Sequence, residues 1–256
     1  MSPYEFGSIF SGIGGLDLGF ERQGFTCRWQ IEIDDYARSI LEKNFPNAKK
    51  HKDIRRCGQA LEPVPGVIGG WPCQDISVAG SGRGLAGSRS GLFFEALRVV
   101  QQVRAEWLVL ENVAGLLVRD MGRVCASLAE VGFDLEWHCI PAADVGAPHI
   151  RDRVFIFGVR RCQNAQIQPR RSPPSPEVLA YSNREGLEKW KGSKEASRAS
   201  TTIARGDWWD AEPDVDRMAH GVPNRVDRVR CLGNAVVPQV AEELARIVRS
   251  RISREG

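Results

Sequence analysis

FGSIFSGIGGLDLGF, at residues 6–20, decides the fold class because it joins a short apolar run to a glycine-rich turn and an amphipathic helix. The run predicts a strand at 6–10, and the apolar spacing after the turn predicts a helix at 16–23. Gly12 and Gly14 let the backbone approach a ligand closely, and the helix N-terminus attracts anionic or polar groups. The third glycine of the pattern GxGxxG is missing, so an ordinary tight turn stays an alternative to a ligand-binding loop.

The same alternation of strand and helix continues to about residue 160. Asp34 and Asp35 are candidate N-caps of the second helix, and Gly132 would end the fourth. Alternation at this pitch predicts βαβ units and hence an α/β fold with a Rossmann-like, doubly wound and mostly parallel sheet. The expected strands are 6–10, 28–33, 66–69, 107–110, 135–140 and 154–158, and the expected helices are 16–23, 36–45, 92–103 and 119–131.

Apolar periodicity is lost after residue 160, where the chain contains the segment RRSPPSP and a cluster of charges. This texture predicts a small irregular region. Periodicity then returns, and Pro238 opens a helix whose apolar face is formed by Val240, Leu244, Ile247 and Val248. The sequence therefore divides into an ordered domain at 1–160, a small irregular region at 161–217 and a return segment at 218–256 that packs on the first domain.

The composition is that of a globular protein, with 256 residues, 42% hydrophobic and 26% charged. No apolar run is long enough to cross a bilayer and the N-terminus does not read as a signal peptide, so we expect no membrane contact and a cytoplasmic protein. The seven cysteines contain no CxxC pair and the four histidines are scattered, which predicts reduced thiols and no metal site. The charge is −3 over residues 1–150 and +6 over 151–256, and the basic second part suits a polyanionic partner.

Two acidic positions follow the glycine turn at spacings that suit a nucleoside-bearing cofactor. Glu32 ends the second predicted strand about 20 residues after the turn, where a carboxylate can bind ribose hydroxyls. Asp53 and Ile54 follow the next helix, where they could contact the edge and the face of an adenine ring. A solvated strand end is the alternative for Glu32, but the combination favours a cofactor site.

Cys73 follows a predicted strand in the sequence GGWPCQ and precedes a loop with five glycines among residues 80–91. Most cysteines are small buried hydrophobic residues, but ligands bind at the carboxyl ends of strands in α/β sheets. The glycine-rich loop is of the kind that moves over a site. Cys73 is therefore a candidate functional residue rather than a core cysteine.

Charged residues flank two more predicted strands. Glu111 directly follows the apolar run 107–110, so it is either a strand-end cap or a general acid whose pKa is raised by burial. Arg151 and Arg153 precede the last predicted strand, and their spacing of two puts them on the same side. An exposed strand start is the alternative reading of that pair.

Taken in series, these motifs resemble the cytosine carbon-5 DNA methyltransferases, which use S-adenosylmethionine. The most specific feature is the ordered succession of Pro-Cys-Gln, Glu-Asn-Val, Arg-x-Arg and Gly-Asn-Ala-Val, and roughly two thirds of the chain is covered. The resemblance rests on FSGIGGLDLGF at 10–20, Glu32, Asp53-Ile54, GGWPCQDIS at 69–77, GLFFEALRV at 91–99, LENV at 110–113, IRDRVFIFGV at 150–159 and LGNAVVP at 232–238.

The resemblance implies methylation of carbon 5 of a cytosine that is flipped out of a short specific sequence in double-stranded DNA. The Cys73 thiolate would add to carbon 6, which makes carbon 5 nucleophilic enough to take the methyl group. Glu111 would protonate or hydrogen-bond ring nitrogen 3, and Arg153, with Arg151 beside it, would hold the carbonyl oxygen of the base. The loop that closes over the DNA would carry Gln74, Ser77 and Arg83.

The resemblance also implies a site for S-adenosylmethionine, with S-adenosylhomocysteine as the product and no metal. Ile33 stands where the family usually has an aromatic residue, so weaker stacking on adenine is expected. His149 stands where the family has a glutamine, and its role stays open. The expected cofactor-binding residues are Phe10, Gly12, Gly14, Gly15, Leu16, Glu32, Ile33, Asp53, Ile54, Pro72, Leu92, Asn234 and Val236.

By the same resemblance, residues 1–160 form the catalytic and cofactor-binding domain and 161–217 read the target. The second region is short for the family, which predicts a short target site. We expect a monomer in a bacterial or phage-infected cell. The resemblance allows two settings, a pair with a separately encoded restriction endonuclease or an orphan or phage enzyme that acts alone.

Three other functions fit part of the sequence. An amino-group DNA methyltransferase carries an Asp/Asn/Ser-Pro-Pro-aromatic motif, but the segment SPPS at 172–175 lacks the aromatic residue and lies in the irregular region. A tRNA cytosine methyltransferase would share the same catalytic motifs. A nucleic-acid-binding protein without catalysis is disfavoured because Cys73, Glu111, Arg153 and Asn234 are all present.

Overall fold

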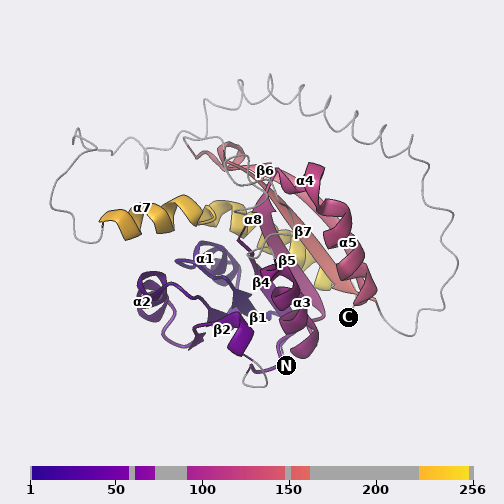
Figure 1. Ribbon diagram of the computed structural model, residues 1–256, viewed down its shortest axis with the longest axis horizontal. Coiled ribbons are helices and arrows are strands. Elements are labelled where there is room, and N and C mark those ends of the chain that lie inside the picture. The colour runs from indigo at the N-terminus through magenta and orange to yellow at the C-terminus, as the bar shows by residue number, and fades with distance from the viewer. Residues whose placement is uncertain (1, 58–60, 73–90, 148–150, 162–224, 254–256) are drawn as a thin grey trace, which may run out of the picture. The chain divides into compact units, whose positions relative to one another are not determined.

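A computed structural model describes residues 2–57, 61–72, 91–147, 151–161 and 225–253. They belong to one compact unit, formed by residues 1–161 and 221–256 (Figure 1). The expected recognition region at 161–217 lies outside the described residues except for Arg161, so the division of the chain into three parts stays a prediction. No described helix is both long enough and apolar enough to cross a membrane.

The described strands form one mixed sheet: β1 (Glu5–Ile9), β2 (Thr26–Ile31), β3 (Lys49–His51), β4 (Gly66–Gly70), β5 (Trp107–Val113), β6 (Phe133–Pro141) and β7 (Asp152–Arg160). Their order is β3-β2-β1-β4-β5-β7-β6 (Figure 1). The strands from β3 to β5 are parallel, and β7 runs antiparallel to both β5 and β6. The mostly parallel α/β sheet expected from the sequence is confirmed.

The described helices are α1 (Gly15–Arg22), α2 (Asp35–Asn44), α3 (Leu92–Gln102), α4 (Leu116–Arg119), α5 (Met121–Glu130), α7 (Arg225–Asn234) and α8 (Pro238–Ile252), with 3-10 turns η1 (Ile54–Arg56) and η3 (Ala142–Val145). Three predicted helix signals are confirmed. Asp34 caps α2 by accepting a hydrogen bond from the Ala37 amide at 2.9 Å. Pro238 is the first residue of α8, and Gly132 follows the end of α5 with φ +93°.

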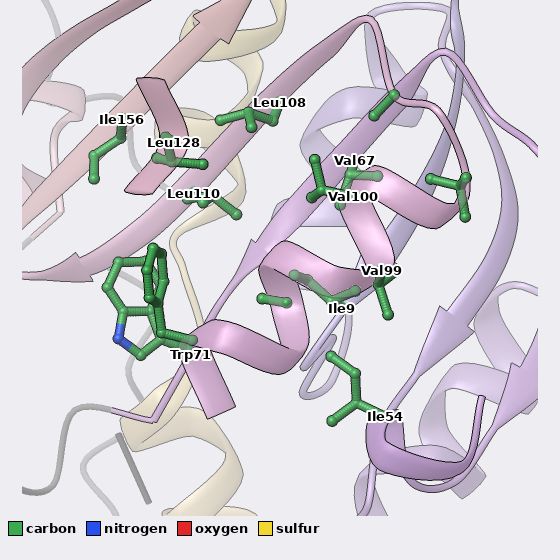
Figure 2. Close-up of a cluster of buried hydrophobic side chains, with 14 of the residues drawn as sticks. Ile9, Ile54, Val67, Trp71, Val99, Val100, Leu108, Leu110, Leu128 and Ile156 are labelled. Carbon is green, nitrogen blue, oxygen red and sulfur yellow. The ribbon is translucent and has the colours of Figure 1, made fainter. Parts of the chain in front are cut away.

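Alternate residues of β5 point to opposite faces of the sheet and enter two separate apolar cores. Leu108 and Leu110 enter the first core, where they pack with side chains of α3 and α5 (Figure 2). Trp107 and Val109 enter the second core, which side chains of α1, α2 and α8 complete. Helices therefore cover both faces of the sheet, which confirms the doubly wound architecture.

Several elements differ from the sequence prediction. β3 and α7 were not expected, and β3 is a charged three-residue segment that pairs with β2 at the edge of the sheet. The helix expected at 119–131 is confirmed as α5, which begins two residues later at Met121 because Asp120 is non-helical with φ −134°; the short α4 before Asp120 was not expected. Ile247 was expected in the core, but it is 38% exposed because the buried stripe of α8 follows Val240, Leu244 and Val248.

Two helical glycines make a matched pair for testing the packing of α1 on α8. A Cβ at Gly19 would lie 2.3 Å from the Ala241 Cβ and 2.6 Å from the Pro238 carbonyl oxygen, whereas a Cβ at Gly122 on α5 would meet no atom within 4 Å. We predict that Gly19→Ala lowers the free energy of unfolding by about 1–3 kcal/mol, because overpacking outweighs helix propensity. Gly122→Ala should raise it by up to about 1 kcal/mol. Urea denaturation checks both, and equal shifts would contradict the close packing at Gly19.

Candidate active site

A pocket of about 300 Å³ lies at the carboxyl ends of β1, β2, β4 and β5, and residues of the C-terminal segment also line it. Ligands bind at this edge of open α/β sheets, where the strand order reverses. The fold thus brings together motifs that lie more than 200 residues apart. The sequence-predicted site residues that line this pocket are Phe10, Gly12, Gly15, Leu16, Glu32, Ile33, Pro72, Glu111, Arg151, Arg153, Asn234 and Val236.

Backbone amides hold the Glu32 carboxylate in one orientation. Gly12 N donates to Glu32 Oε2 at 2.7 Å, and Asp34 N donates to Glu32 Oε1 at 2.8 Å. An ionised carboxylate offers about four acceptor positions, so Glu32 keeps room for further donors. A Cβ at Gly12 would meet no atom within 4 Å, and the turn leaves open space beside this acid. The arrangement suits a ligand with neighbouring hydroxyl groups.

The C-terminal segment packs tightly on the first turn of α1. A Cβ at Gly15 would lie 2.2 Å from the Val236 carbonyl oxygen, so glycine is required for this approach. Gly14 does not line the pocket. It caps α1 with φ +84°, and a Cβ there would lie 2.4 Å from the Phe45 ring. Gly14 therefore supports the conformation of the turn without contacting the pocket.

A second hollow of about 280 Å³ adjoins the first, and Ile33 lines both. Asp53 lines the second hollow, and its carboxylate accepts from Arg55 Nε at 3.0 Å and Nη2 at 2.9 Å. This pairing holds the pKa of Asp53 below its ordinary value. Like Gly14, two more predicted cofactor residues line neither hollow: Ile54 is buried in the core, and Leu92 packs half-buried against it.

Glu111 and Arg153 form a partly buried ion pair across β5 and β7. Arg153 Nε lies 2.7 Å from Glu111 Oε1, and the two side chains are 21% and 14% exposed. Burial raises the pKa of Glu111 above its ordinary value, and the guanidinium groups of Arg153 and Arg151 oppose this rise only in part. Arg151 donates to the Gly233 carbonyl oxygen and so links this pair to the C-terminal segment. A carboxyl in this state can hold or pass on a proton at the pocket wall.

Asn112 fastens the backbone that leads out of β4. Its Nδ2 donates to the Trp71 carbonyl oxygen at 3.2 Å, and its Oδ1 accepts from the Val113 amide at 2.9 Å. The first bond is buried and the second is partly buried, so loss of the Asn112 side chain would leave polar groups without partners. Asn112 thereby fixes the end of β4 just before Pro72, which lines the pocket.

Several predicted residues lie outside the described ranges, namely Cys73, Gln74, Ser77, Arg83 and His149. Within the described ranges, no cluster of three or more His, Cys, Asp or Glu side chains could hold a metal ion.

The sequence profile of the family described as C-5 cytosine-specific DNA methylase matches residues 4–210. The chain belongs to this family. The matched range includes Glu32, Glu111 and Arg153, which line the pocket described above.

Relatives of this DNA methylase chain include bacterial enzymes. The type II methyltransferase M.FnuDI of Fusobacterium nucleatum is 38% identical over 165 residues, which is 61% of this chain and 47% of the relative. M2.BsuMI of Bacillus subtilis strain 168 is 35% identical over 158 residues, 59% of this chain and 40% of the relative. A solved structure from E. coli, described as a prophage-encoded DNA modification methyltransferase, is 28% identical with a TM-score of 0.51 and covers 61% of this chain and 46% of that one. The chain thus spans about half the length of the relatives it matches, or less.

Some residues that line the pocket were not expected from the sequence. Arg230 and Cys231 come from α7, which the sequence pattern did not predict. Asp17 is completely buried and accepts a hydrogen bond from Gln30 Nε2 at 2.7 Å, and burial raises its pKa. Asp17 could have been found from one signal in the sequence, namely an acidic residue on the apolar face of the predicted helix at 16–23.

Proposed function

We propose that the protein is a DNA (cytosine-5-)-methyltransferase, which uses S-adenosylmethionine to methylate carbon 5 of a flipped cytosine in a short specific sequence. One observation carries the proposal: the partly buried Glu111–Arg153 pair shares a pocket with Glu32 and the glycine turn. An acid with a raised pKa thus lies beside a site that fits a nucleoside-bearing cofactor. Membership of the cytosine-specific family supports the same conclusion.

The residues of the two hollows fit S-adenosylmethionine. The remaining acceptor positions of Glu32 suit two ribose hydroxyls. Ile33, 57% exposed, offers an apolar surface to adenine, and Asp53 lines the hollow beyond it. When bound, the cofactor supplies an electrophilic methyl group. The rest of its surface would meet Phe10, Leu16, Pro72, Asn234 and Val236.

Cys73 follows Pro72 directly in the sequence, and we infer that it is the nucleophile. Its thiolate bonds to carbon 6 of the cytosine and converts the ring into an enamine, whose carbon 5 takes the methyl group. Loss of the proton from carbon 5 then restores the double bond, breaks the sulfur–carbon bond and returns the thiolate. The base must leave the stacked duplex for the sulfur to reach carbon 6.

Glu111 is suited to act as the acid in this addition. Because burial raises its pKa, its carboxyl retains a proton to a higher pH and can pass it to ring nitrogen 3 as the thiolate adds. Arg153 keeps donors beyond the one that faces Glu111, and these can bind the carbonyl oxygen of the base. Arg151, which donates to the Gly233 carbonyl oxygen, would help to position the Glu111–Arg153 pair.

Double-stranded DNA is the inferred partner. We infer that Gln74, Ser77 and Arg83 contact the DNA beside the extruded base, and that residues 161–217 read the sequence. The curated relatives are named type II methyltransferases, which supports a separately encoded restriction endonuclease as the partner enzyme. A monomer in the cytoplasm of a bacterial or phage-infected cell completes the proposal.

Exchange of the recognition region should change the target. Replacing residues 161–217 with the corresponding region of a relative of different specificity should move methylation to the relative's sequence, because contacts to base edges specify sequence. Affinity for S-adenosylhomocysteine should stay within about twofold, because the residues that line the pocket are kept. Bisulfite sequencing reads the target, and an unchanged site would place recognition elsewhere in the chain.

The proposed activity is tested by expressing the protein in a host that lacks cytosine methylation, followed by bisulfite sequencing of DNA and tRNA. Methylated cytosines within one short DNA motif are the expected result. Methylation confined to tRNA would instead assign the RNA substrate that the catalytic motifs also allow. Absence of methylation in both, with S-adenosylmethionine bound, would identify a binding protein without catalysis.

A further inference from the structure

An ion pair joins two parts of the pocket wall that are 196 residues apart in the sequence. Arg230 on α7 contacts the Asp34 carboxylate at the start of α2, and both residues line the pocket. Arg230 also lies 3.0 Å from Asp227, which is three residues earlier on α7. The Arg230 guanidinium therefore lies between Asp227 of its own helix and Asp34 at the start of α2.

Asp34 connects this ion pair to Glu32. The Asp34 amide donates to Glu32 Oε1 at 2.8 Å, while Asp34 Oδ1 accepts from the Ala37 amide at 2.9 Å. Asp34 Oδ2 faces Arg230. A single residue thus caps α2, orients the acid proposed to bind ribose and receives the contact from α7.

Apolar packing holds α7 only weakly. Val226, Val229 and Leu232 are 79%, 64% and 67% exposed, and Cys231 is the buried member among the described side chains of this helix. The polar contacts of Arg230 and the bond from Arg151 to the Gly233 carbonyl oxygen therefore account for much of its attachment. Asn234, directly after this bond, lines the pocket.

We propose that the Arg230–Asp34 pair clasps α7 to the start of α2 and that Arg230 is a positioning residue for the S-adenosylmethionine site. This inference rests on the proposed function of the pocket. The clasp holds the pocket residues of α7 beside Glu32 before the cofactor binds. Less conformational entropy is then lost on binding. Loss of the clasp lowers the fraction of molecules that are ready to bind and raises the rate at which the ligand leaves.

A double-mutant cycle with S-adenosylhomocysteine as the probe tests the clasp. Asp34→Asn removes the charge but keeps a side chain that caps helices well, and Arg230→Gln removes the guanidinium. Exposed ion pairs have modest energies, so each single change should weaken binding about two- to fivefold, mainly through faster dissociation. The double variant should bind no worse than either single one. Calorimetry gives the affinity, and stopped-flow fluorescence gives the dissociation rate.

Two comparisons separate a clasp from a general loss of structure. Arg246→Ala breaks an ion pair with Glu243 on α8 and touches no pocket residue, so it should leave affinity and dissociation unchanged. Raising the salt concentration to about 0.5 M should screen the ion pair, so the affinity and dissociation rate of the wild type should approach those of the variants. Single variants that bind like the wild type, or effects that multiply in the double variant, would overturn the clasp. A wild-type protein that binds neither S-adenosylhomocysteine nor S-adenosylmethionine would instead overturn the proposed function.

Discussion

Replacing Cys73 with serine should abolish methyl transfer, with a loss on the order of 10⁴-fold or more. A free thiol with a pKa near 8.5 is already a few per cent thiolate at neutral pH, whereas a hydroxyl supplies almost no anion to attack carbon 6. Binding of DNA and of S-adenosylhomocysteine should stay near that of the wild type, because the change removes little volume. Transfer of a labelled methyl group, together with a DNA gel shift, measures both.

Cys139→Ser provides the control for that experiment, because this thiol is exposed on β6 and does not line the pocket. Duplex DNA with 5-fluorocytosine at the target provides a direct trap, since fluorine cannot leave carbon 5 as a proton does. The wild type and Cys139→Ser should become cross-linked to this DNA in the presence of S-adenosylmethionine, and Cys73→Ser should not. Full activity of Cys73→Ser, or a cross-link to another residue, would remove Cys73 from its assigned role.

Much of the sheet could be predicted because its inner strands lie between two cores. β4 and β5 are apolar on both faces, and such runs are conspicuous in a sequence. β3 could not be found in this way, since its Lys49–His51 segment is charged and its pairing with β2 depends on the assembled sheet. The short α4 before Asp120 was likewise not found, because its four residues are too few to show a helical period.

The candidate site was predictable where each residue ends a strand. Glu32 directly follows β2 and Glu111 follows the apolar run 107–110 of β5, and parallel strands bring their carboxyl ends to one edge of the sheet. Asn112 and Arg230 were not given a role, because their partners lie 41 and 196 residues away and no local pattern marks them. Sequence reasoning therefore located the chemical groups, whereas the contacts that orient them depend on tertiary structure.

Glu111→Gln should slow methyl transfer by about 10²–10⁴-fold while affinity for S-adenosylhomocysteine changes by less than about threefold. Glutamine has the same shape, and its carbonyl oxygen can still accept from Arg153, but it has no acidic proton to give to ring nitrogen 3. Glu95→Gln on α3 is the control, because Glu95 pairs with Arg98 and lines neither hollow. Single-turnover kinetics separate the chemical step from binding, and a normal rate in Glu111→Gln would require another acid.

The same substitution should also change how stability depends on pH. Because burial raises the pKa of Glu111 in the folded protein, the folded state binds a proton more tightly than the unfolded chain does. The resulting stabilisation is complete below the ordinary pKa of about 4.3 and is lost as the pH rises through the folded pKa. Glu111→Gln lacks this loss, so in urea titrations its free energy of unfolding should rise relative to that of the wild type as the pH increases above the ordinary pKa of a glutamate. If the free energy of unfolding depends on pH in the same way in both proteins, Arg153 keeps the Glu111 carboxylate ionised. The proton for ring nitrogen 3 would then have to come from another group.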